Sequence, residues 1–230
     1  MKKFWSYISN DKFSVGCTGQ TVFLYDKDGN ELGKFKDIIY AYTPMISPDG
    51  KLFVVKSTEG RLAVYSLETL SLIKKFRFSK VDGSQDDGFC FSPYGKLFIN
   101  IERQKDDLHS AISVYNTFDF SLSNRILLGE DMMISHIEFD KETNKYYVLG
   151  FIRGDDLVID HGFVAEFEDH QIKNITAISV KEYDFYTSYK ALEIMGFTKK
   201  AYEWSFMDRE LDELKSMNLT LANLYKNYNK

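Results

Sequence analysis

The sequence is poor in cysteine, which excludes a fold held together by disulfides. Only 2 cysteines occur in 230 residues, whereas small domains that depend on disulfides carry many more. Cys17 and Cys90 fall on predicted strands of different repeats, and their spacing matches no metal-binding pattern. We therefore expect two buried, reduced thiols in a cytoplasmic protein.

Long apolar runs and an excess of positive charge are also missing. No apolar run approaches the roughly 18 residues of a membrane-spanning helix, and Phe4 to Ile8 is too short for the apolar core of a signal peptide. The formal net charge is −5, whereas general nucleic-acid-binding proteins are basic. We therefore expect neither a membrane span nor a nucleic-acid partner.

Motifs for common enzyme chemistries are absent as well. The sequence has no Gly-x-Ser-x-Gly, no phosphate-binding loop and no paired Cys and His signature. Proline is rare, with 3 residues, and Lys, Asn, Phe and Tyr are frequent. This composition indicates a low-GC, bacterial coding sequence.

Short apolar runs separated by turn residues are what the sequence has in abundance. The stretch from Ser47 to Phe76 contains apolar runs at 52–55 and 62–65, and a third run follows at 72–78. All three are rich in β-branched and aromatic residues, which is typical of strands. Pro48-Asp49-Gly50 forms a turn signal, because Pro fixes φ at the first corner and Gly accepts a positive φ. The stretch predicts one antiparallel meander.

This meander recurs along the chain. A turn that ends in lysine precedes the second strand of each repeat, and an aromatic residue closes each third strand. The turn lysines are Lys12, Lys51, Lys96 and Lys145, and the closing aromatics are Tyr25, Tyr65, Tyr115 and Phe167. Successive lysines are 39, 45 and 49 residues apart, which is near the period of a four-stranded β-propeller blade.

The segments SPDGKLFVV and RLAVYSLETLSLIKKF resemble a blade of the WD-repeat-like and YVTN-type β-propellers. The Gly-His and Trp-Asp signatures of true WD repeats are absent, so the resemblance implies only the broad superfamily. It covers residues 4–182, is strongest over 40–127 and carries no catalytic motif. The expected fold is mainly β, a four-bladed propeller with a C-terminal helical extension. The four-stranded antiparallel blades are predicted at 4–37, 38–79, 88–128 and 134–181. We favour a closed ring of four blades; otherwise the helices fill a gap, or two chains share a ring.

The apolar period becomes helical near residue 183, so we divide the chain into a propeller at 1–182 and a helical extension at 183–230. Gly196 stands where a helix C-cap glycine belongs, and Thr198 can cap the next helix. An apolar stripe is expected to pack on the propeller; the alternative is a partner or dimer surface. The stripe consists of Phe185, Leu192, Met195, Trp204, Leu211 and Leu214.

Acidic residues gather in the links that blade topology places at one end of the strands, namely those between strands two and three and those between blades. These links lengthen along the chain, and long loops on a rigid scaffold often carry binding. We expect this acidic end to dock a basic protein; the alternative is that the acids are only solvated. The predicted partner-binding residues are Asp82, Asp86, Asp87, Asp106, Asp107, Glu130, Asp131, Asp155, Asp156 and Asp160.

Cation sites are weaker hypotheses, and we expect no bound metal or cofactor. The stretch 26–30 resembles the start of a calcium loop, but Glu31 occupies the position that needs Gly, so a hairpin turn is the better interpretation. Oxygen and imidazole groups that could meet around a cation are Asp106, Asp107, His109, Asp155, Asp156, Asp160 and His161. His136, in a strand, and His170, in a turn, are expected to be structural.

These features predict a non-enzymatic protein that binds another protein through its acidic end. An immunity protein that covers a basic toxin, such as a nuclease, is the more specific form of this hypothesis. The alternatives are a propeller hydrolase or lyase with a site built from loops, and an assembly subunit that uses its helical tail. Polar or metal-binding groups on the innermost strands would favour an enzyme. Among the segments 4–7, 40–42, 89–91 and 134–137 of these strands, His136 is the single His, Asp, Glu, Lys or Arg residue, which argues against chemistry in the central channel.

Overall fold

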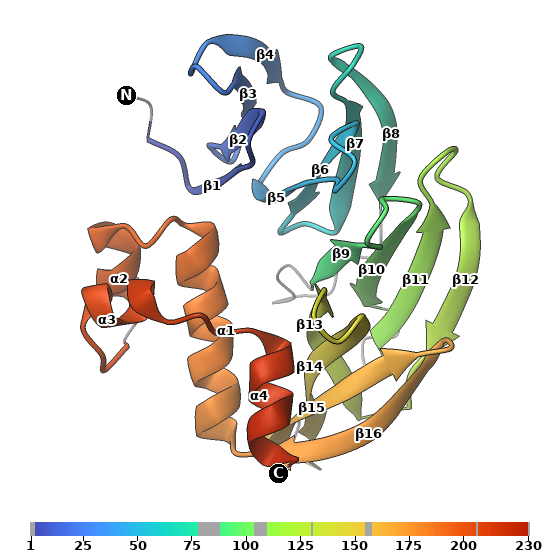
Figure 1. The fold of residues 1–230 in the computed structure, drawn as a ribbon, viewed down its shortest axis with the longest axis vertical. Helices are drawn as coiled ribbons and strands as arrows, with labels where there is room; N and C mark the ends of the chain where they lie inside the picture. Colours follow the sequence, from blue (N-terminus) through green and yellow to red (C-terminus); the bar gives the residue numbers. More distant parts are fainter. Residues whose placement is uncertain are drawn as a thin grey trace. The chain divides into compact units, whose positions relative to one another are not determined.

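The computed structural model describes residues 3–77, 88–103, 110–129, 131–154, 158–205 and 207–229. Within these ranges the strands form four antiparallel sheets of four strands each (Figure 1). The sheets confirm the four repeats predicted from the sequence. None of the helices in the described part is long and apolar enough to cross a membrane.

The strands of each sheet follow one another in chain order. The first two sheets contain β1 (Ser6–Ser9), β2 (Phe13–Cys17), β3 (Val22–Asp26), β4 (Glu31–Phe35), β5 (Ala41–Ile46), β6 (Leu52–Ser57), β7 (Arg61–Ser66) and β8 (Ser71–Arg77). The other two contain β9 (Phe89–Phe91), β10 (Leu97–Arg103), β11 (Ser110–Asn116), β12 (Leu122–Leu127), β13 (Met132–Asp140), β14 (Lys145–Arg153), β15 (Ile159–Glu168) and β16 (Gln171–Ile178).

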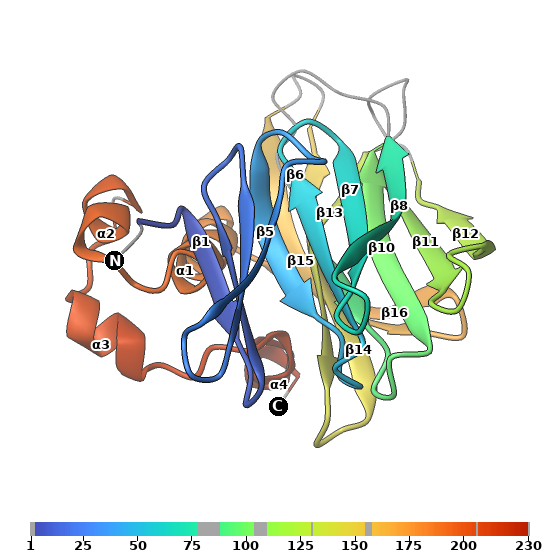
Figure 2. The same cartoon turned by 90° about the horizontal axis from the view of Figure 1, so that it is seen from above.

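Burial explains the different compositions of inner and outer strands. β6 and β7 are buried at nearly every position, which suits their continuous apolar runs. β8 lies at the edge of the same sheet (Figure 2) and alternates exposed with half-buried residues. Lys74 and Lys75 on this edge help to prevent pairing with a strand of another chain.

The turn chemistry read from the sequence is confirmed in blades two and three. Gly50 and Gly95 have φ angles of 69° and 67°, in the region where Gly has no steric cost. The serine that opens each turn accepts a backbone hydrogen bond, at 2.9 Å from Leu52 N to Ser47 Oγ and at 2.9 Å from Leu97 N to Ser92 Oγ.

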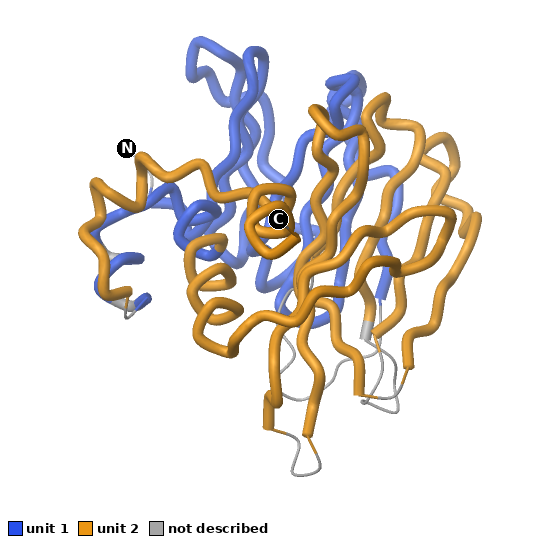
Figure 3. Tube along the Cα trace, turned by 60° about the horizontal axis from the view of Figure 1, so that its bottom comes forward, with its two compact units in different colours: residues 1–86, 191–206 blue, residues 87–190, 207–230 orange. Residues whose placement is uncertain are grey.

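The described residues divide into two compact units (Figure 3). The first spans 1–86 and 191–206, and the second spans 87–190 and 207–230. The core of the first unit lies within the first two sheets and includes the stacked rings of Phe53 and Tyr65. The second unit has one core in blades three and four, and another where blade four meets α1 and α4.

The C-terminal segment is helical, as predicted, and comprises α1 (Val180–Ile194), α2 (Lys199–Ser205), α3 (Leu211–Ser216) and α4 (Leu221–Tyr228). α1 begins before residue 183 because Ser179 and Glu182 form a capping box, in which each side chain accepts the other residue's N–H. Gly196 has a φ of 66°, which confirms its C-cap role, and Thr198 Oγ1 accepts the N–H of Ala201.

The predicted apolar stripe needs a correction in α1. Its buried residues are Tyr183, Tyr186, Tyr189 and Leu192, whereas Phe185 and Met195 are only half-buried. Tyrosine suits this face because its ring is apolar and its hydroxyl can meet polar groups on the strand beneath. In α3, Leu214 is buried and Leu211 half-buried; the side chain of Trp204 lies outside the described part.

Candidate functional site

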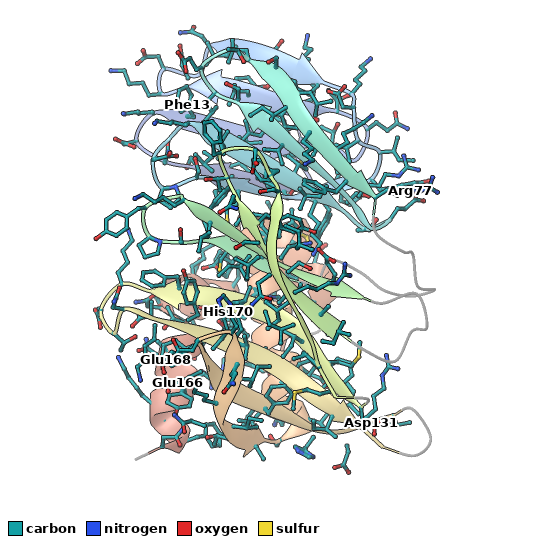
Figure 4. All side chains as sticks on the ribbon, turned by 90° about the vertical axis from the view of Figure 1, so that its right-hand side faces the viewer. Phe13, Arg77, Asp131, Glu166, Glu168 and His170 are labelled. Atoms are coloured by element: carbon teal, nitrogen blue, oxygen red, sulfur yellow. The ribbon has the colours of Figure 1, made fainter. Side chains whose placement is uncertain are left out.

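Two of the ten predicted partner-binding acids lie in the described part of the chain. Asp131 and Asp160 are both exposed, and they lie at the same end of blade four. Both acids lie next to Arg153 at the end of β14. The N–H of Arg153 donates to the carbonyl of Asp131 at 3.0 Å, and Arg153 is paired across the sheet with Ile159, the neighbour of Asp160. Figure 4 shows Asp131 at the opposite end of the sheet from Glu168 and His170. The acids outside the described residues are Asp82, Asp86, Asp87, Asp106, Asp107, Glu130, Asp155 and Asp156.

A denser group of polar side chains lies where α1 packs on β13. This β13–α1 cluster consists of Ser135, His136, Glu138, Tyr183, Tyr186 and Lys190. Its centre is the carboxylate of Glu138, which accepts hydrogen bonds from Lys190 Nζ at 2.8 Å, Tyr186 Oη at 2.9 Å and Leu221 N at 2.9 Å.

Strand geometry brings these residues to one face. His136 and Glu138 are two residues apart, so their side chains project from the same side of β13. A register shift between Ile134 and His136 leaves Ser135 out of the regular ladder. Its hydroxyl pairs with Tyr183 Oη at 2.5 Å. The cluster therefore joins an irregular strand to the first three turns of α1.

His136 is held in its neutral form at neutral pH. Burial lowers the pKa of this imidazole to about 4; the nearby Glu138 carboxylate opposes this shift, and the Lys190 ammonium adds to it. The ring of Tyr186 lies edge-on to the imidazole, with centroids 6.1 Å apart. A neutral imidazole beside this ring avoids placing a second cation next to Lys190.

We expect His136 to make the protein less stable in acid. Its pKa is lower in the folded state than its ordinary value of 6.5, so between pH 6.5 and about 4 the unfolded chain binds more protons. A pKa difference of one unit corresponds to about 1.4 kcal/mol, so the free energy of unfolding should fall by about 3 kcal/mol across this window. Urea unfolding of wild type and His136→Asn at several pH values measures this. An identical pH dependence in both proteins would contradict it.

The arrangement of the cluster is that of a clamp. Glu138 is occupied by three donors that come from α1 and from the start of α4, and Ser135 is engaged by Tyr183. These contacts tie the helices of the second unit to blade four. Charge-assisted hydrogen bonds of this kind are stronger than neutral ones.

The sequence analysis missed Glu138, as well as two buried carboxylates in other strands. Glu102 accepts a hydrogen bond from Tyr115 Oη at 2.7 Å and pairs with Arg125 at 2.9 Å. Glu166 accepts from Lys145 Nζ at 2.7 Å. The available signal was an acid within an otherwise apolar strand, where burial requires a partner.

The cation candidates find little support in the described part of the chain. There, no three His, Cys, Asp or Glu residues gather closely enough to hold a metal. Asp160 pairs with His161 at 2.7 Å. Asp106, Asp107, His109, Asp155 and Asp156 lie outside the described residues.

The turn at Asp26 is a hairpin turn. Its carboxylate accepts the N–H groups of Asp28 at 2.9 Å and Asn30 at 2.8 Å, and the side-chain and backbone hydrogen bonds of Asn30 lower the pKa of this carboxyl. The two cysteines, Cys17 and Cys90, are buried free thiols, as expected.

Neither a protein-family model nor a curated protein matches this chain. Solved structures do match it. Hydrazine synthase of Kuenenia stuttgartiensis aligns with a TM-score of 0.57 and 13% identity over 74% of this chain and 51% of its own. The WD40 domain of Toxoplasma gondii coronin aligns with a TM-score of 0.56 and 13% identity over 76% and 45%.

Dihydro-heme d1 dehydrogenase NirN, in complex with DHE, aligns with a TM-score of 0.55 and 16% identity over 74% of this chain and 35% of its own. This chain therefore spans about half or less of each of these three structures. They include enzymes and a WD40 domain, and one fold can host many functions. With its four antiparallel sheets, the chain is a mainly β, four-bladed β-propeller with a C-terminal helical extension.

Proposed function

We propose that this propeller is a non-catalytic protein that docks a basic protein partner through the acidic end of its blades. The observation that carries the proposal is the placement of Asp131 and Asp160, both exposed at one end of blade four. The sequence places eight more acids in the corresponding links, and the net charge of −5 favours a basic partner.

Exposed carboxylates of this kind act mainly on the rate and specificity of association. A single surface ion pair contributes about 1 kcal/mol or less, but a group of like charges attracts an oppositely charged partner over a longer range. Binding should therefore weaken as salt rises. In its most specific form, the protein is an immunity protein that covers the active site of a basic toxin.

We expect Asp131→Asn combined with Asp160→Asn to weaken partner binding about tenfold at low salt, mainly through slower association. The partner is first captured from the source cells on immobilised wild type, then purified and measured by surface plasmon resonance. The control replaces two exposed acids at the opposite end of blade four, in the β13–β14 and β15–β16 turns. These changes are Glu142→Gln and Asp169→Asn, which alter the net charge by the same amount. Equal weakening by both pairs, or binding that does not depend on salt, would contradict the proposal.

A second candidate function is an enzyme, favoured by the β13–α1 cluster. It places Ser135, His136 and Glu138 on the first strand of a blade, and two matching structures are named as a synthase and a dehydrogenase. The test is turnover of small molecules in hydrolase and lyase assays. An activity of wild type that His136→Asn loses and Asp131→Asn keeps would establish this alternative.

A further inference from the structure

Two aromatic side chains are almost fully exposed to solvent at the end of blade three that carries the β9–β10 and β11–β12 turns. Phe118 is 99% exposed and Tyr94 80% exposed. The turns that carry them are joined, because Thr117 donates its N–H to the carbonyl of Lys96 at 3.1 Å and its hydroxyl to the carbonyl of Gly95 at 2.6 Å. A shallow hollow of about 320 Å³ lies beside Phe118. Its lining residues are Lys96, Asn116, Thr117, Phe118 and Asp119.

Blade two shows that the fold does not require these rings. The matching turns read SPDGK and SLETL in blade two, and SPYGK and NTFDF in blade three. Asp49 and Glu68 therefore occupy the positions of Tyr94 and Phe118. Asp49 even supports its turn, since its carboxylate accepts from Ser47 Oγ at 2.6 Å and from Lys51 N at 3.1 Å.

Blade three gives up these hydrogen bonds and gains an exposed ring. The buried aromatic of its second turn is Phe120, at 1% exposure, so Phe118 is not needed to fill the core. Exposed rings that do not serve packing are typical of binding surfaces, where Tyr and other aromatics supply much of the contact energy.

The charged groups around the hollow indicate what it binds. The Oδ1 atom of Asp119 accepts both the N–H and the hydroxyl of Ser121, at 2.9 Å and 2.7 Å, and the amide of Asn116 donates to the same hydroxyl at 3.2 Å. Both therefore have structural roles within the turn. Lys96 is exposed, and no ion pair in the described part of the chain includes it. The hollow thus combines the ring of Phe118 with the ammonium group of Lys96, which is available to an anion.

We propose that this hollow binds a short peptide segment of a protein partner, in which an apolar or aromatic side chain lies next to a carboxylate. The apolar side chain packs against Phe118 and Tyr94, and the carboxylate pairs with Lys96. The volume of the hollow is near the lower end for ligand sites, which suits one or two side chains. This surface lies at the opposite ends of the strands from Asp131 and Asp160 and does not depend on the acidic docking end.

The test uses two pools of fluorescent peptides. Each peptide has one fixed Phe in a sequence of Gly and Ser. The residues next to the Phe are Glu in the acidic pool and Lys in the basic pool. Wild type should bind the acidic pool more tightly. The variant Tyr94→Asn with Phe118→Gln removes both rings without adding charge, and its side chains are the neutral counterparts of those in blade two. It should fold like wild type, checked by thermal unfolding, and bind the acidic pool at least tenfold more weakly.

Lys96→Gln should weaken binding of the acidic pool about threefold, so that the two pools bind equally well. As a control, Asp49→Asn with Glu68→Gln should leave binding unchanged, as should Asp131→Asn with Asp160→Asn. The proposal fails if the ring variant binds as wild type does, if the basic pool binds equally or better, or if wild type binds neither pool at about 1 mM, a concentration that corresponds to a binding free energy of about −4 kcal/mol.

Discussion

Gly150→Ala is expected to lower the free energy of unfolding by about 3 kcal/mol or more. A Cβ atom at this position would collide with the carbonyl oxygen of Met133 and lie 2.5 Å from Cζ of Phe163. The carbonyl belongs to a paired strand, with Met133 opposite Phe151 and Ile134 opposite Gly150, so it cannot move without breaking the ladder. Phe163 is fully buried and has no free space into which to turn.

Urea unfolding measures this loss, and hydrogen exchange of the β13 and β14 amides locates it. The matched control is Gly129→Ala, because a Cβ there meets nothing within 4 Å and Gly129 lies outside the strands. We expect the control to change stability by less than about 0.5 kcal/mol. Equal stability of Gly150→Ala and wild type would show that blade four can relax around an added methyl group.

Glu138→Gln is expected to lower the free energy of unfolding by about 2–3 kcal/mol, because it removes the charge at the centre of the β13–α1 cluster. The side chains of Glu138 and Lys190 are 28% and 12% exposed, so the loss should be below the 3–5 kcal/mol typical of a fully buried pair. Gln keeps the size of the side chain but brings an NH₂ group toward three donors. One donor or more is left unsatisfied, and this is the main energetic cost.

Glu138→Gln should also loosen the structure locally, in addition to lowering the global free energy of unfolding. Hydrogen exchange should speed up in α1 and at the start of α4, where Leu221 N loses its acceptor, and change little in blade three. The matched control is Glu142→Gln, since the Glu142 side chain is 86% exposed and lies 4.0 Å from Lys226. If the two variants unfold at the same urea concentration, Glu138 does not clamp the helices.

The repeats and the turn chemistry were readable from the sequence because they depend on neighbouring residues. Gly50 and Gly95 adopt the positive φ that their turns need, and Gly196 ends α1 as its position indicates. The capping box at Ser179 and Glu182 was equally local, and recognising it would have corrected the start of α1. For the acidic links, the sequence predicted the end of blade four at which the exposed Asp131 and Asp160 lie; that this end docks a partner stays a proposal.

The sequence alone determined four blades, their turns and a helical C-terminal segment, because hydrophobic period and turn residues act over a few positions. The tertiary structure decided which polar residues have partners inside the fold. Glu138 lies 83 residues from Leu221, whose N–H it accepts, and no local pattern records such a contact. The same is true of the tyrosine face of α1, because which face of a helix is buried depends on the strand that packs against it.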